Sequence, residues 1–143
     1  MEFDLIREHL ATQPNWAVTV EDHTVQVRLP LADGRTQAVT IRRVGHVDAM
    51  GVSSEVIEFS SIVVEVPAGK TIPPPLALRL LQTNSRMLFG AWGLGEHDGR
   101  QFLAIYESAL LATLDVEELV TFVTVLATEA DRLEHEWGGE DVW

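Results

Sequence analysis

The stretch from Leu76 to Trp143 decides the fold, because three recognisable units follow one another in it. It begins with a short helix, LALRLLQT (76–83), continues through a hairpin that turns at HDGR (97–100), and ends in a long helix opened by LDVEE (114–118). This order of units specifies a fold much better than it specifies an activity.

The terminal helix has the clearest signals. Asp115 is placed to accept hydrogen bonds from first-turn amides, and Glu118 lies at the reciprocal position of a capping box. Gly138-Gly139 is expected to end the helix. Apolar residues recur at alternating steps of four and three, so they share one side of the helix, which is predicted to be buried: Leu119, Val123, Leu126, Ala130, Leu133 and Trp137.

The first half of the chain reads as one helix followed by strands. Apolar residues within 3–10 predict a short helix, and alternation predicts strands around 16–20, 25–29 and 39–41. A polar loop is expected over 46–54, and a fourth strand over 55–66 changes phase at Ser60-Ser61, which predicts a bulge or break there. The order α-β-β-β-β-α-β-β-α predicts a single α+β domain over residues 1–143, with helices packed on an antiparallel sheet.

Composition narrows the class of protein. The chain has no cysteine, no apolar run of the length that spans a membrane and no signal peptide, so a cytoplasmic location is expected. Its net charge is −12, and from Asp115 onward nine acidic residues face a single arginine. Direct nucleic-acid binding is not expected, because phosphate contacts require clustered basic residues and the chain has one lysine, Lys70.

The sequence has no motif for catalysis, a cofactor or a metal. The glycines at 90, 93 and 95 do not have the spacing of a phosphate-binding loop, and a hairpin rather than a helix follows them. The histidines at 9, 23, 46, 97 and 135 are scattered and no pair has metal-ligand spacing. We therefore expect a protein that is not an enzyme and needs no cofactor, unless a site is assembled from residues far apart in the chain.

A few residues are candidates for contact with a partner. Trp92 and Tyr106 fall on opposite arms of the predicted hairpin, where aromatic side chains either fill the core or anchor an interface. The acidic end of the chain either keeps the protein soluble or steers a basic partner towards it. The candidate partner-binding residues are Trp92, Tyr106, Glu134, Glu136, Trp137 and Glu140.

The second half of the chain resembles the type III secretion chaperone-like superfamily, which includes the CesT-type chaperones and the YbjN-domain proteins. The resemblance rests on Leu80-Leu81-Gln82-Thr83-Asn84, on the turn and strand glycines up to Gly99, and on Leu103, Leu114-Asp115, Leu119, Phe122 and Ala130. It implies a small acidic homodimer without catalytic activity that binds other polypeptides, chaperone-like or as a regulatory adaptor. A small-ligand-sensing regulatory domain is the alternative.

Overall fold

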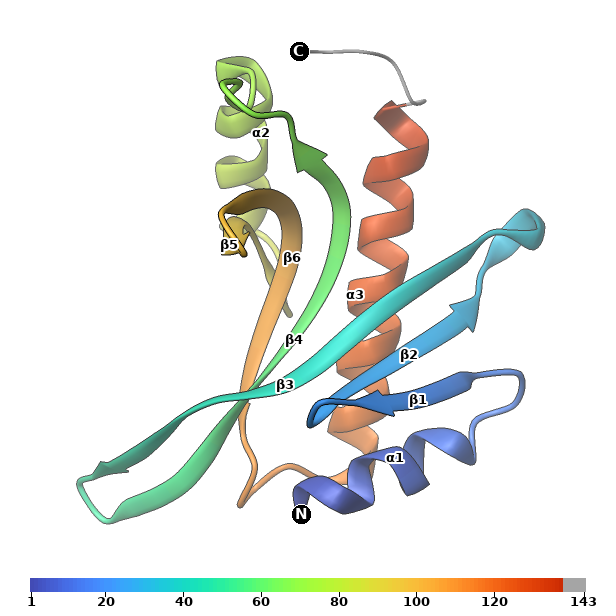
Figure 1. Cartoon of the computed structure of the whole chain (residues 1–143), viewed down its shortest axis with the longest axis vertical. Coiled ribbons are helices and arrows are strands. Elements are labelled where there is room, and N and C mark those ends of the chain that lie inside the picture. Colours follow the sequence, from blue (N-terminus) through green and yellow to red (C-terminus); the bar gives the residue numbers. More distant parts are fainter. Residues whose placement is uncertain (138–143) are drawn as a thin grey trace.

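The computed structural model describes residues 1–137, in which helices pack on a strongly twisted sheet (Figure 1). In chain order the elements are α1 (Phe3–Ala11), β1 (Ala17–Glu21), β2 (Thr24–Pro30), the 3₁₀ turn η1 (Ala32–Gly34), β3 (Thr36–Ala49), β4 (Val52–Val66), α2 (Pro74–Asn84), β5 (Ala91–His97), β6 (Arg100–Leu110) and α3 (Val116–Trp137). The predicted order of helices and strands and the α+β class are confirmed.

All neighbouring strands are antiparallel, and their order across the sheet is β1-β2-β3-β4-β6-β5. Two-residue turns close three hairpins at Asp22-His23, Met50-Gly51 and Asp98-Gly99, and both residues of each turn have positive φ. This conformation matches the right-handed twist of the flanking strands, and glycine adopts it without strain. The hairpin predicted at Asp98-Gly99 is therefore present.

The loop predicted over residues 46–54 is wrong. Strands β3 and β4 instead continue as one long hairpin, with His46 opposite Glu55 and Ala49 opposite Val52. Figure 1 shows this hairpin projecting beyond the helices. Residues 44–53 are all exposed, so neither face carries the apolar alternation by which a half-buried strand is recognised.

The irregularity in β4 lies slightly later than predicted. Ser60 and Ser61 keep regular pairing with Tyr106 and Ile105, and the register shifts only between Ile62 and Val64. Ser61 is buried, where its hydroxyl donates a 2.8 Å hydrogen bond to the carbonyl of Ala38. Ser61 thus continues the core-facing alternation of Ile57 and Phe59, and the change of phase that buries Val66 comes only at the later shift.

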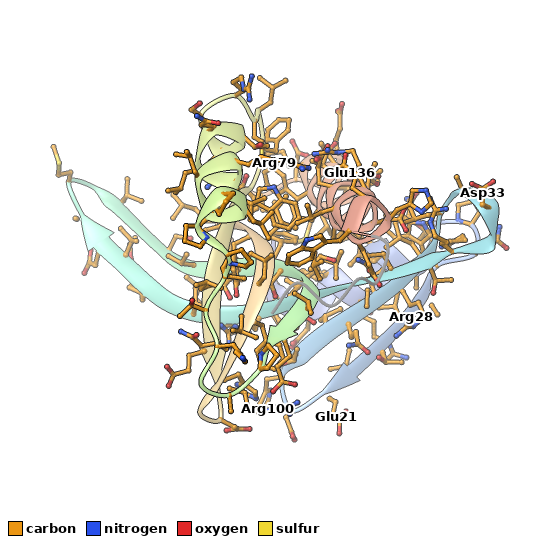
Figure 2. All side chains as sticks on the ribbon, turned by 90° about the horizontal axis from the view of Figure 1, so that it is seen from above. Glu21, Arg28, Asp33, Arg79, Arg100 and Glu136 are labelled. Carbon is orange, nitrogen blue, oxygen red and sulfur yellow. The ribbon has the colours of Figure 1, made fainter. Side chains whose placement is uncertain are left out.

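Helix α3 runs over the middle of the sheet and contacts β3, β4 and β6, while α1 lies against β1 and β2 and α2 against β5 (Figure 1). The predicted stripe from Leu119 to Leu133 is buried, and Trp137 is half-buried against the same core. The capping box is confirmed by a 2.8 Å bond from the Glu118 amide to Asp115 Oδ1 and a 3.3 Å bond from the Asp115 amide to Glu118 Oε2. Among residues 1–137, no helix lies on the opposite face of the sheet (Figure 2).

Candidate functional site

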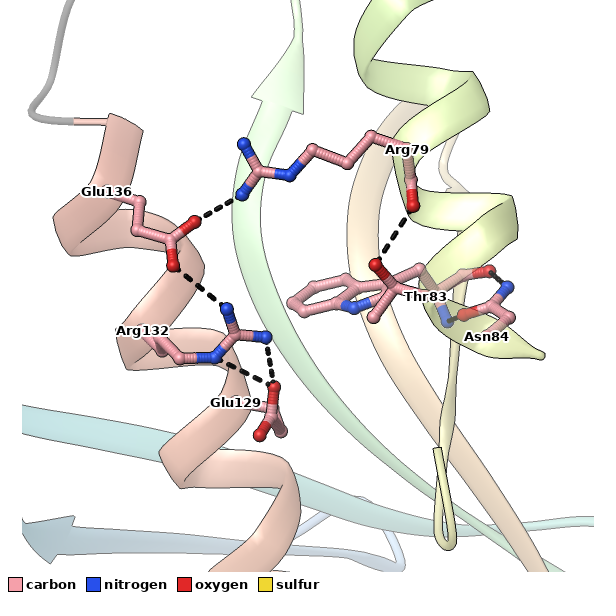
Figure 3. A network of polar contacts seen from close by, with 7 residues as sticks. Arg79, Thr83, Asn84, Glu129, Arg132 and Glu136 are labelled. Atoms are coloured by element: carbon pink, nitrogen blue, oxygen red, sulfur yellow. Dashed lines mark hydrogen bonds and ion pairs between the residues drawn. The ribbon is translucent and has the colours of Figure 1, made fainter. Parts of the chain in front are cut away.

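Strand β5 is an edge strand, and one side chain of α2 covers part of its edge. Asn84 accepts a 2.6 Å hydrogen bond from the Trp92 amide on Oδ1 and donates a 3.0 Å bond from Nδ2 to the Trp92 carbonyl (Figure 3). The carboxamide therefore takes the place of a neighbouring strand at this one residue. It also shows that the backbone of Trp92 points away from β6.

The direction of the Trp92 backbone also fixes the direction of the other backbone groups along β5. In an antiparallel ladder, backbone groups alternate between the two neighbours, so the N–H and C=O groups of Leu94 and Glu96 also point outwards. Within residues 1–137 no strand pairs with this edge. An edge of this kind is a template for pairing with another chain.

Exposed leucines flank this edge on α2 and β5. Leu78, Leu81 and Leu94 are 58%, 66% and 52% exposed, although leucine side chains are usually buried. Leu81 and Leu94 line an apolar groove of about 250 Å³ between the helix and the strand, which is completed by Ile72, Ala77, Leu80, Trp92, Gly93 and Leu103. We call Leu78, Leu81, Leu94 and the outward backbone of β5 the α2–β5 edge.

The aromatic pair of the hairpin divides between the two faces of the sheet. Trp92 lies opposite Ile105 and is 6% exposed, whereas Tyr106 lies opposite Ala91 and is half-buried on the face without helices. Trp92 therefore fills the core, on the opposite face of the sheet from Tyr106. Among the described residues, its Nε1 is a buried side-chain donor without a hydrogen-bond partner.

The acids at the end of α3 are held in ion pairs (Figure 3). Glu136 accepts a hydrogen bond from Arg79 of α2 and a 2.9 Å bond from Arg132, and Arg132 also donates to Glu129 over 3.1 Å. These contacts lower the pKa of Glu136 against the opposing effect of its partial burial. Glu136 is thus a link between α2 and α3 rather than a free charge.

A second arginine reaches α3 from the start of β3. Arg35 Nε and Nη2 donate to Asp131 Oδ1 and Oδ2 over 2.8 and 2.9 Å, and this pairing lowers the pKa of Asp131. Glu134 is exposed, and its Oε2 accepts a 3.3 Å bond from Gln37.

Three of the four acids between Glu129 and Glu136 are therefore paired with the guanidinium groups of Arg35, Arg79 and Arg132, and Glu134 is the exception. The strong local negative charge expected from sequence is largely offset there. Glu140 lies outside the described residues.

The structure-derived site differs from the predicted one mainly through α2. Leu78 and Arg79 belong to no motif, and Leu81 belongs only to the segment on which the resemblance rests. The leucines of α2 surround the helix, so sequence alone does not show which of them stay exposed. Within residues 1–137, no group of three His, Asp or Glu side chains is arranged to hold a metal ion. None of the described helices is both long and apolar enough to cross a membrane.

Comparison with known proteins identifies the fold. No protein-family model matches the chain, and no curated protein matches its sequence. The fold is shared with a YbjN protein, one of the groups that the resemblance named. The crystal structure of YbjN from E. coli, described as a candidate transcription regulator, aligns with a TM-score of 0.62 over 96% of this chain and 92% of that chain. Because the two sequences are 19% identical, the likeness shows a shared fold.

Proposed function

We propose that this chain is a non-enzymatic protein that forms a homodimer and binds a partner polypeptide, as an adaptor or regulator. The observation that carries the proposal is the α2–β5 edge, where exposed leucines lie beside backbone groups that point outwards. Such an edge combines the hydrogen bonds of strand addition with apolar contact area. Function at this edge requires no chemical step.

A second copy of the chain is the occupant that suits the α2–β5 edge best. A two-fold axis beside β5 places the same strand of both copies antiparallel, so that each supplies the hydrogen bonds that the other lacks. The leucines of each α2 then lie next to those of the other copy. Asn84 limits this pairing to the part of β5 beyond Trp92, because its carboxamide already occupies the backbone there.

The partner polypeptide is expected to be basic or to contain an extended apolar segment. The net charge of −12 attracts basic chains over long distances and mainly raises the rate of association. Since Glu136 is paired with arginines, Glu134 is the better residue with which to test such steering.

Light scattering tests the dimer. The wild-type protein should have about twice the chain mass of 15.9 kDa at micromolar concentration, and Leu81→Glu should shift it towards the monomer by placing a charge in the contact. Val20→Glu is the matched control, because Val20 is 49% exposed on β1 at the opposite edge of the sheet. A wild-type monomer across dilution, or a dimer that survives Leu81→Glu, contradicts the proposed interface.

Defined peptides test partner binding. Fluorescence anisotropy with a basic and an apolar extended peptide should show saturable binding to the wild-type protein. Glu134→Gln should slow association of the basic peptide while leaving dissociation nearly unchanged.

A thermal-shift screen with small molecules addresses the alternative of a ligand-sensing domain. Stabilisation by a small molecule without binding of either peptide would favour that alternative.

A further inference from the structure

The face of the sheet without helices contains a hollow of about 550 Å³. Its walls come from β2, β3 and β4 on one side and from the β5–β6 hairpin on the other. Figure 2 shows the ends of the two outer hairpins, marked by Glu21 and Arg100, on the same side of the molecule. The twist of the sheet thus produces a concave surface of the size that small-molecule sites have.

Two glycines of the edge strand β5 leave the space that the Tyr106 ring occupies in this hollow. A Cβ atom at Gly93 would lie 3.5 Å from the Tyr106 ring, and one at Gly95 would lie 1.9 Å from its hydroxyl oxygen. Any larger residue at 95 would displace the tyrosine, so the glycine is needed for the position of the ring. Partial burial raises the pKa of Tyr106, as does the nearby Glu58 carboxylate, so the phenol stays protonated at neutral pH.

A charged pair on neighbouring strands supplies complementary hydrogen-bonding groups. Arg42 Nε and Nη2 both donate to Glu58 Oε1, over 3.0 and 2.8 Å. Glu58 Oε2 and Arg42 Nη1 have no hydrogen-bond partner among residues 1–137, and the hydroxyls of Thr40, Ser60 and Tyr106 have none there either. The hollow therefore offers one strong acceptor beside one strong donor, next to an aromatic ring.

The remaining lining residues favour a flat ligand that carries no negative charge. Ile62 is exposed and Phe102 half-buried, and both contribute apolar surface to the hollow. The carboxylates of Glu58 and Glu96 outnumber the single guanidinium of Arg42, so an anionic ligand is disfavoured.

We propose that this hollow binds a neutral flat heterocycle that carries an N–H donor beside a carbonyl acceptor, as nucleobases do. The N–H donates to Glu58 Oε2, the carbonyl accepts from Arg42, and the ring packs against Tyr106. Ligand binding here is a further activity that does not require the contacts proposed at the α2–β5 edge, although Leu94 belongs to both surfaces.

Inosine is a suitable probe, because N1–H and the C6 carbonyl are adjacent in its base. Tyr106 is the only tyrosine of the chain, so NMR of the protein with labelled tyrosine reports directly on the hollow. Inosine should shift the tyrosine ring signals saturably, whereas 1-methylinosine, which lacks the N–H, should bind about tenfold more weakly. Inosine monophosphate should also bind more weakly than inosine. Equal binding of inosine and 1-methylinosine, binding of ribose alone, or no shift at millimolar inosine would overturn the proposal.

Two substitutions test whether the position of the Tyr106 ring matters for binding. Gly95→Ala should weaken inosine binding about tenfold by displacing the Tyr106 ring, since aromatic stacking accounts for an effect of that order. A Tyr106→Phe background removes the hydroxyl oxygen, which is the closest atom, and leaves only the 3.1 Å approach to Cζ, so Gly95→Ala should have a clearly smaller effect there. Because this background contains no tyrosine, the inosine affinities of these variants are compared by isothermal titration calorimetry. Equal effects in the two backgrounds would show that the ring position does not matter. Val20→Glu serves as the control, because it lies outside the hollow and should leave inosine binding unchanged.

Discussion

Truncation of Leu126 to alanine should destabilise the protein by about 2 to 5 kcal/mol. The Leu126 side chain is fully buried, and its Cδ1 packs close to Gly90 just before β5, so α3 and the sheet meet at this residue. The truncation removes roughly three buried carbon groups at about 0.8 kcal/mol each, which gives the lower part of the range. The cavity left behind adds the remainder, because a close-packed core collapses only in part. Leu133→Ala should fall within the same range, since Leu133 is 3% exposed.

Urea unfolding at a fixed protein concentration measures this effect, with the midpoint lowered and the slope unchanged. A fixed concentration is needed because dimer formation adds to the apparent stability. Thr128→Ala is the matched control on the exposed side of α3, where the lost hydroxyl bonds only the Thr124 carbonyl, and it should change stability by less than about 0.5 kcal/mol. A change for Leu126→Ala below about 0.5 kcal/mol would show that the stripe faces solvent and would refute the assignment.

Further predictions concern the polar contacts of α3 and α2. Asp131→Asn should cost about 1 kcal/mol at pH 7, because it removes a bidentate pair with Arg35. Since the folded pKa of Asp131 is lowered, this stabilisation is present above the unfolded pKa of about 3.9 and disappears as the pH falls through the folded value. Acid titration of both proteins by circular dichroism should therefore show converging stabilities, and a difference that persists at low pH would contradict the pairing. Asn84→Ala should speed hydrogen exchange of the Trp92 amide by about tenfold, because it removes the acceptor of that amide. Gln82→Ala, at an exposed position of the same helix, is the control and should leave this exchange rate unchanged. Unchanged exchange in Asn84→Ala would show that Asn84 does not protect the edge.

The parts of the fold that the sequence predicts are those with repeated or local signals. Helix α3 carries a capping box and an apolar stripe, and both depend only on residues a few positions apart. The hairpin at Asp98-Gly99 likewise depends on a turn conformation that those two residues adopt readily. The β3–β4 hairpin was missed beyond Arg43 because its backbone pairing continues where no core requires apolar alternation.

The candidate site was harder to predict because it depends on which side chains and backbone groups stay exposed after the helices and strands have packed together. Trp92 and Tyr106 are identifiable as aromatic residues of one hairpin, but their separation onto two faces depends on the register with Ile105 and Ala91. Leu78 and Leu81 of α2 have the same chemistry as the buried Leu80, and only the position of α2 against β5 distinguishes them. The exposed edge is thus a property of the assembled sheet.

Charge shows the same dependence on tertiary structure, and here it changes the functional interpretation. Read along the chain, the acids of α3 form an unbalanced cluster, yet Arg35 comes from the start of β3 and Arg79 from α2 to pair with them. Removal of Glu136 would therefore loosen α2 as well as reduce the charge, since the Arg79 pair joins α2 to α3. An effect of Glu136 on partner binding would not separate steering from the shape of the α2–β5 edge. Glu134 has no such link to α2 among the described residues, so a slower association caused by Glu134→Gln can be attributed to charge.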